Sequence, residues 1–164
     1  MNSDDLSLFG AVGLAKEAER KAEEFYMRAA RRTLNPSGHR LFRQLAGFEH
    51  QHFERLAALA RSLATQSAFT GHVEAVQVGT ATSEVGAIPD ESPKSAMDIL
   101  AMALGIEEKA RKRYTELAER TDDPAGREMF TRLAAEEHQH HRTLTNAVNS
   151  LDRYGVWDWS AHDA

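Results

Sequence analysis

Several residue types and patterns are missing from this 164-residue sequence. It contains no cysteine, which excludes disulfides, thiolate-bound zinc, iron–sulfur clusters and iron held by four thiolates. It has four prolines and no strand-like alternation of apolar and polar residues, which favours a helical protein. No segment approaches the roughly eighteen uninterrupted apolar residues of a membrane span.

A strong excess of positive charge is also missing. The formal net charge is −5 and there is no basic block, so binding to nucleic acid or to an anionic membrane is not expected. The acidic start, residues 1–5, does not resemble a secretory signal, so we expect a cytoplasmic protein. The apolar fraction of 41% and the charged fraction of 27% are typical of one globular domain. The eight histidines are a first hint of chemistry.

The chain contains an internal repeat. When residues 15–60 are set over residues 103–148, a shift of 88, 18 of the 46 positions are identical. Composition alone would give roughly three identities. The matches include the tetrapeptide Glu-His-Gln-His at 49–52 and 137–140. Similar Ala-rich amphipathic helices would explain matched Ala and Leu, but not matched Glu, His, Tyr, Pro and Gly.

Each copy of the repeat predicts a helical hairpin. Asn35-Pro36, Ser92-Pro93 and Asp123-Pro124 each place a capping side chain before a proline at the first helical position. We predict helices at about 5–33, 37–65, 93–120 and 124–150. Residues 66–92 would form a long crossover, either with some structure of its own or as a disordered linker. Two hairpins joined by such a crossover predict an all-α, ferritin-like four-helix bundle over residues 1–150, followed by a tail at 151–164.

Ionisable residues interrupt the inward stripe of each predicted helix, which is otherwise apolar. A buried, unpaired carboxylate is costly, so it must be neutralised, paired or bound to a cation. The stripes offer no Lys or Arg nearby, and metal ions would supply the missing positive charge. The interrupting residues are Glu19, Glu49, His52, Glu107, Glu137 and His140.

These residues are also predicted to lie at one level of the bundle. Glu19 and Glu49 are equidistant in sequence from the first hairpin tip, and Glu107 and Glu137 from the second. At ~1.5 Å per residue, each pair lies about 22 Å from its turn. A Glu and a His three residues apart can reach the same ion. One Glu from each of two helices with Glu-x-x-His from the other two is a di-iron or di-manganese ligand set, and it suits Fe or Mn better than structural Zn.

This pattern resembles the rubrerythrin and ferritin-like di-iron family over roughly residues 8–150. The resemblance implies two Fe ions per chain, with Mn as an alternative metal, and Glu49 and Glu137 as bridging ligands. Glu19 with His52, and Glu107 with His140, would be terminal ligands, although which His accompanies which Glu stays open. Tyr26 and Tyr114 resemble tyrosines that hydrogen-bond to ligating carboxylates; the alternative is that they only pack at the edge of the core.

Two departures from rubrerythrin bear on activity. Without cysteine there is no rubredoxin domain, so electrons would come from another protein or from Fe(II) itself. Peroxidase-type members carry an additional Glu three residues after the ligand of the third helix, where this chain has Ala110. Glu108, beside the ligand, lies about 100° round the helix and is expected to face away. The resulting set of four Glu and two His is nearly symmetric, as in bacterioferritin-like sites.

Other unusual residues receive a structural interpretation. The histidines outside the ligand set are expected to be surface or packing residues: His39, His50, His72, His138, His141 and His162. The charged run from Lys16 to Arg32 is expected to be a solvated face. The tail segment Tyr154–Trp159 contains three aromatics, which could fold back on the bundle, cover a dimer interface or dock into another protein.

The functional hypothesis is a non-haem di-iron oxidoreductase that binds two Fe(II) and oxidises them with O2 or H2O2, as a ferroxidase or as a peroxide scavenger. One alternative is iron storage or delivery, with the same residues forming the entry site. Another is a di-iron oxygenase acting on an organic substrate. The resemblance also implies a homo-oligomer, a dimer or larger, and allows an external electron donor.

Overall fold

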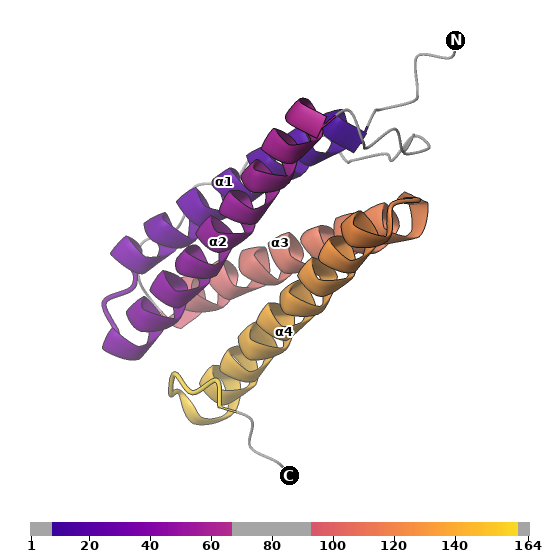
Figure 1. Ribbon diagram of the computed structural model, residues 1–164. Coiled ribbons are helices and arrows are strands. Elements are labelled where there is room, and N and C mark those ends of the chain that lie inside the picture. The colour runs from indigo at the N-terminus through magenta and orange to yellow at the C-terminus, as the bar shows by residue number, and fades with distance from the viewer. Residues whose placement is uncertain (1–7, 67–92, 161–164) are drawn as a thin grey trace.

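The computed structural model describes residues 8–66 and 93–160, and these two ranges contain four long helices (Figure 1). They are α1 (Leu8–Arg32), α2 (Pro36–Gln66), α3 (Pro93–Arg120) and α4 (Pro124–Tyr154). No strand occurs in these two ranges, so the all-α prediction is confirmed. The predicted crossover lies outside the described residues, apart from Gln66, which ends α2.

Helices α1 and α2 form one antiparallel hairpin, and α3 and α4 form the other (Figure 1). Asn35 begins α2 by accepting hydrogen bonds at Oδ1 from the backbone N–H groups of Ser37 (2.9 Å) and Gly38 (3.3 Å). Asp123 does the same for α4, accepting at Oδ2 from the N–H of Gly126 at 2.6 Å. A proline follows each cap, where its missing N–H removes no helical bond. Both predicted hairpin turns are therefore confirmed; the third predicted cap, Ser92, lies outside the described residues.

The last helix is longer than predicted. We expected α4 to end near residue 150, but it continues to Tyr154. It ends at Gly155, which adopts φ 66° and donates its backbone N–H to the carbonyl of Leu151 at 3.0 Å. Since glycine enters the left-handed region without a Cβ penalty, Gly155 readily forms this cap.

The core consists of two apolar clusters that together draw on all four helices. The first cluster contains residues from the start of α1 and α4 and from the end of α2 and α3, among them Val12, Leu56, Tyr114 and Phe130. The second contains residues from the opposite ends of the same helices, among them Phe25, Phe42, Leu100 and Leu144. The middle of every helix therefore passes between the clusters, and this is the level at which the sequence places its carboxylates.

The aromatic tail folds back on the bundle. Trp157 packs edge-on against Phe42, with ring centroids 5.9 Å apart, and both tryptophans join the second apolar cluster. Asn146 of α4 donates a hydrogen bond to the carbonyl of Trp159 at 3.4 Å. The tail thus connects the end of the second hairpin to the tip of the first. A role of its exposed residues in a dimer interface or in docking another protein stays a prediction.

The tail packs so closely on α2 that Gly38 has no room for a side chain. A Cβ at this position would lie 2.7 Å from Thr33 Cγ2 and 2.8 Å from Trp157 Cε2. We therefore expect Gly38→Ala to lower the free energy of unfolding by about 1–3 kcal/mol through overpacking. Urea unfolding followed by circular dichroism measures this change.

Gly47, in the same helix, provides the matched control. It is exposed and nothing lies within 4 Å of a Cβ placed there, so Gly47→Ala should stabilise the protein by about 1 kcal/mol through helix propensity. The loss at Gly38 should shrink in a Trp157→Ala background. Equal stabilisation by both alanines would contradict the packing of the tail.

No helix in the described ranges is long and apolar enough to cross a membrane. The cytoplasmic location stays a prediction.

Candidate metal centre

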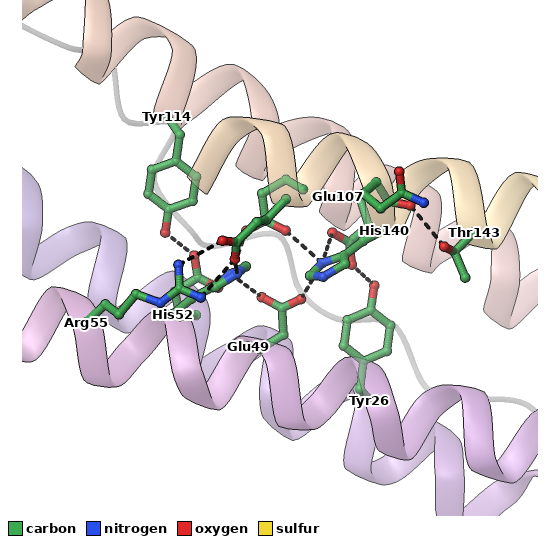
Figure 2. A network of polar contacts seen from close by, with 12 residues as sticks. Tyr26, Glu49, His52, Arg55, Glu107, Tyr114, His140 and Thr143 are labelled. Carbon is green, nitrogen blue, oxygen red and sulfur yellow. Dashed lines mark hydrogen bonds and ion pairs between the residues drawn. The ribbon is translucent and has the colours of Figure 1, made fainter. Parts of the chain in front are cut away.

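Four glutamates and two histidines meet between the two apolar clusters (Figure 2). Helix α1 supplies one Glu, α3 another, and α2 and α4 each supply a Glu and a His three residues later. Each of the six residues is 6% exposed or less, and five are at most 1% exposed. The structure therefore brings together the complete predicted set: Glu19, Glu49, His52, Glu107, Glu137 and His140.

The six residues form two overlapping groups. Glu19, Glu49, His52 and Glu137 offer ligand atoms that all lie within 4.8 Å of one another, and so do Glu49, Glu107, Glu137 and His140. Glu49 and Glu137 belong to both groups, whereas each group has its own Glu and its own His. Two ions placed in these groups would share two carboxylates, which matches the bridging and terminal arrangement implied by the family resemblance.

Two carboxylate oxygens in the centre are buried without a hydrogen-bond partner in the described part of the chain. They are Glu49 Oε1 and Glu107 Oε2, and both lie 3.4 Å from His140 Nδ1 without forming a hydrogen bond to it. An unsatisfied buried acceptor costs about 1–3 kcal/mol, and more if it is charged. A cation bound between these oxygens would compensate that cost, so the donor set fits a metal.

The two hairpins exchange hydrogen bonds through a pair of buried tyrosines. Tyr26 of α1 donates its hydroxyl hydrogen to Glu107 of α3, and Tyr114 of α3 donates to Glu19 of α1 (Figure 2). Burial and nearby carboxylates raise the pKa of both tyrosines well above the usual value of 10, which keeps the hydroxyls as donors. The tyrosines therefore contact the glutamates as predicted, but each contacts the glutamate of the other hairpin.

Both histidines direct Nδ1 toward the carboxylates. Nδ1 of His52 and Nδ1 of His140 each lie 3.1 Å from a different oxygen of Glu137. Burial lowers the pKa of a histidine, but here the surrounding carboxylates outweigh that effect. They raise the pKa of His140 to about 12, and that of His52 rises in the same direction. These shifts favour protonated imidazoles, which would supply part of the positive charge that the carboxylates need in the absence of metal.

The glutamates of the cluster do not share one electrostatic environment. Burial raises the pKa of Glu107 to about 7, although His140 opposes the shift. Burial and the three other carboxylates raise the pKa of Glu49 well above its usual range. For Glu137, burial also acts upward, but the hydrogen bonds from His140 and His52 win and hold its pKa well below 4.5.

One pair of residues at the centre was not predicted from the sequence. His52 Nε2, on the far side of the ring from the cluster, lies 2.9 Å from Glu136 Oε2. Arg55 holds Glu136 with two hydrogen bonds of 3.0 Å (Figure 2). Partial burial raises the pKa of Glu136, but Arg55 and His52 outweigh it and lower that pKa overall. The internal repeat did contain a signal for Glu136. Its two copies have identical Glu-His-Gln-His segments, but the residue just before the segment is Phe48 in one copy and Glu136 in the other.

Those residues that were expected outside the ligand set and that the structure describes do lie outside it. Glu108 faces away from the metal centre and pairs with Arg111 at 2.7 Å, and Ala110 lies in the first apolar cluster.

The other histidines have surface or packing positions where the structure describes them. His50 is exposed and lies 3.3 Å from Glu23, whereas Nδ1 of His39 bonds the carbonyl of Ala30 at 2.7 Å. His138 is exposed and His141 half-buried, while His72 and His162 lie outside the described residues. The charged face of α1 carries exposed ion pairs, such as that between Arg20 and Glu17.

Comparison with known proteins supports the resemblance seen in the sequence. Residues 98–156, which include the third Glu and the second Glu-x-x-His segment, match the Rubrerythrin family. A hypothetical protein from Pyrococcus furiosus has a similar structure, with a TM-score of 0.72, 22% identity and coverage of 91% of this chain and 92% of that one. No curated protein sequence matches the chain.

A second solved structure is similar as well. It is described as a putative ferritin-like di-iron-carboxylate protein from Thermotoga maritima, with a TM-score of 0.68 and 19% identity. The alignment covers 94% of this chain and all of the other. These likenesses show the fold, a ferritin-like four-helix bundle, and confirm that prediction. With the family match and the buried carboxylate–histidine cluster, they point to a di-iron type of site.

Proposed function

We propose that this protein is a non-haem di-iron oxidoreductase, which binds two Fe(II) ions and oxidises them with O2 or H2O2. One observation carries the proposal: two overlapping buried groups of ligand atoms share Glu49 and Glu137, and two buried carboxylate oxygens lack hydrogen bonds. A site built only for stability would satisfy those oxygens within the protein. All six residues are almost fully buried among the helices, which would limit the access of bulk water to the bound ions.

Each residue of the centre has a defined task in this proposal. Glu49 and Glu137 would be shared between the two ions, and each ion would have one further Glu and one His Nδ1 as ligands. Fe(II) supplies one electron per ion, so a pair of ions together with two protons could reduce either one H2O2 to two water molecules or one O2 to H2O2. The tyrosine hydroxyls orient the terminal carboxylates, because each donates a hydrogen bond across the bundle to Glu19 or Glu107.

Ligation also requires the histidines to release protons. The surrounding carboxylates raise the pKa of both histidines in the metal-free protein, which favours a proton on each Nδ1. Those protons would leave when a cation binds to the same nitrogens. The protein thereby exchanges one kind of positive charge for another, and the buried carboxylates remain compensated in both states.

The residues around the third helix favour a ferroxidase over a peroxidase. Ala110 occupies the place where an additional carboxylate would be expected in the peroxidase type, and it packs among apolar residues of the first cluster. Glu108 cannot replace it, because its carboxylate is held by Arg111 on the outer face of α3. We therefore propose O2 as the oxidant of the loaded centre, with H2O2 as the alternative.

Anaerobic loading with Fe(II) followed by stopped-flow oxidation tests this function. We expect saturation at two ions per chain, and formation of the ferric product with O2 at a rate equal to or faster than with H2O2. Much faster oxidation by H2O2 would instead indicate peroxide scavenging. Accumulation of many irons per chain would support storage, and the absence of iron binding would contradict the proposal altogether.

A further inference from the structure

The two halves of the metal centre are not equivalent outside the ligand set. On one side, Glu136 of α4 reaches across the bundle to His52 of α2, and Arg55 of α2 holds the same carboxylate (Figure 2). The internal repeat identifies the corresponding positions on the other side as Phe48 and Thr143. The four glutamates of the centre, both histidines and both tyrosines are identical in the two copies of the repeat, so this difference breaks the symmetry directly beside the candidate ligands.

Phe48 cannot do for His140 what Glu136 does for His52. Its ring packs against the imidazole of His140, with centroids 5.0 Å apart and an interplanar angle of 33°. A phenyl ring offers no carboxylate to an imidazole N–H. Thr143 is engaged within its own helix, since its hydroxyl donates to the carbonyl of Gln139 at 3.0 Å. One histidine therefore has a charged acceptor behind it and the other has an aromatic ring.

A carboxylate behind a ligating histidine has a defined chemical effect. It accepts the N–H of the ring nitrogen that does not bind the metal, which fixes the tautomer and the ring orientation and makes the ligating nitrogen more basic. Glu136 is placed for this role, because it contacts Nε2 while Nδ1 faces Glu19, Glu49 and Glu137. Arg55 holds Glu136 with a two-pronged contact, so the carboxylate is oriented before any metal arrives.

We infer that Glu136, held by Arg55, is a positioning residue for His52 that makes the metal position at Glu19 and His52 the tighter of the two. This inference rests on the proposed function, since it assumes that the centre binds two ions. It goes further by assigning a loading order, in which the first ion occupies the position at Glu19 and His52 and the second occupies the position at Glu107 and His140.

The test is calorimetric titration of the metal-free protein with Mn(II), and separately with Co(II), without any oxidant. The parent should show two binding steps of different affinity. Glu136→Leu removes the acceptor and should weaken the tighter step by about 10- to 100-fold while leaving the weaker step unchanged. Glu136→Gln keeps an acceptor without its charge, so it should recover part of the loss. Arg55→Leu should weaken the tighter step less than Glu136→Leu does and more than Glu136→Gln does.

A control variant and a mutant cycle separate positioning from a structural role. Glu128 pairs with Arg132 on the exposed side of α4 and lines the same surface hollow as Glu136, so Glu128→Gln makes the same change of charge nearby. It should leave both steps unchanged. The effect of Glu136→Leu should persist in a His140→Ala background and disappear in a His52→Ala background, because the coupling runs through His52 alone.

A converse double variant should give His140 the carboxylate contact that only His52 has in the parent. Phe48→Glu combined with Thr143→Arg copies the arrangement onto His140 and is expected to strengthen the weaker step. Two steps of equal affinity in the parent, or equal weakening of both steps by Glu136→Leu, would overturn the inference while leaving a di-metal centre intact. A parent that binds neither metal would overturn the proposed function, and the inference with it.

Discussion

Addition of Fe(II) or Mn(II) under anaerobic conditions is expected to raise the Tm of the metal-free protein by about 10–20 °C. At about one hundred times the Kd, each ion adds about 2.7 kcal/mol, and 1 kcal/mol is worth roughly 2–4 °C for a chain of this size. The gain is large because the ions replace an arrangement that leaves Glu49 Oε1 and Glu107 Oε2 unsatisfied in the core. Differential scanning calorimetry at fixed metal excess measures the shift.

Two neighbouring glutamates of α3 provide a matched pair for this measurement. Glu107 is 1% exposed and belongs to one ligand group, whereas Glu108 is held by Arg111 on the outside of the helix. Glu107→Gln should reduce the shift by about half and the stoichiometry from two ions to one, and Glu108→Gln should change neither. If Mg(II) gave the same shift as Fe(II), or if the two variants behaved alike, the cluster would not be a specific metal centre.

The ligand set could be predicted from the sequence because it depends on helical periodicity and the repeat. Glu19, Glu107 and the two Glu-x-x-His segments fall on the inward stripe of each helix, and the hairpin turns fix their level. The apolar pattern therefore determines which side of each helix faces the core. The six candidate ligands lie on that side, so their convergence could be predicted. The start of α2 and α4 was equally predictable, since Asn35 and Asp123 cap them through local contacts.

Features that depend on the placement of one hairpin against the other could not be derived in this way. Tyr26 lies seven residues after Glu19 on the same helix, yet it bonds Glu107 on α3. Glu136 lies on α4 beside the inward-facing stripe and not in it. Its partners on α2, Arg55 and His52, are 81 and 84 residues away in sequence. The path of Trp157 onto Gly38 likewise depends on where α4 ends relative to the tip of the first hairpin.

Glu49 and Glu137 occupy corresponding positions in the repeat, yet we expect opposite effects when each is changed to Gln in the metal-free protein. The pKa of Glu49 is raised by burial and by the other carboxylates. For an acid, a raised folded-state pKa means that stability falls as pH rises above the unfolded value of about 4.5. The ionisable group thus destabilises the folded state at pH 7, and Glu49→Gln should stabilise it by the order of 1–2 kcal/mol.

The ionised carboxylate of Glu137 has the opposite effect on the stability of the fold. Hydrogen bonds from both imidazoles hold its pKa well below 4.5, so its ionised form stabilises the fold at pH 7, and this contribution is lost as pH falls through the folded-state pKa. Glu137→Gln leaves two protonated histidines with one fewer counter-charge and should cost about 3 kcal/mol, as expected for breaking a buried pair. Both variants should lose the metal-induced rise in Tm.

Urea unfolding in the presence of a chelator, at pH 7 and again at pH 4.5, distinguishes the two cases. The gain from Glu49→Gln should shrink to a small remainder at the lower pH, where the parent carboxyl is protonated in the folded state and half-protonated in the unfolded state. The loss from Glu137→Gln should persist, because its folded-state pKa lies below that pH. Equal losses at both positions would mean that the two shared glutamates are electrostatically equivalent. In that case the centre would balance its charges symmetrically, and not through Glu137 alone.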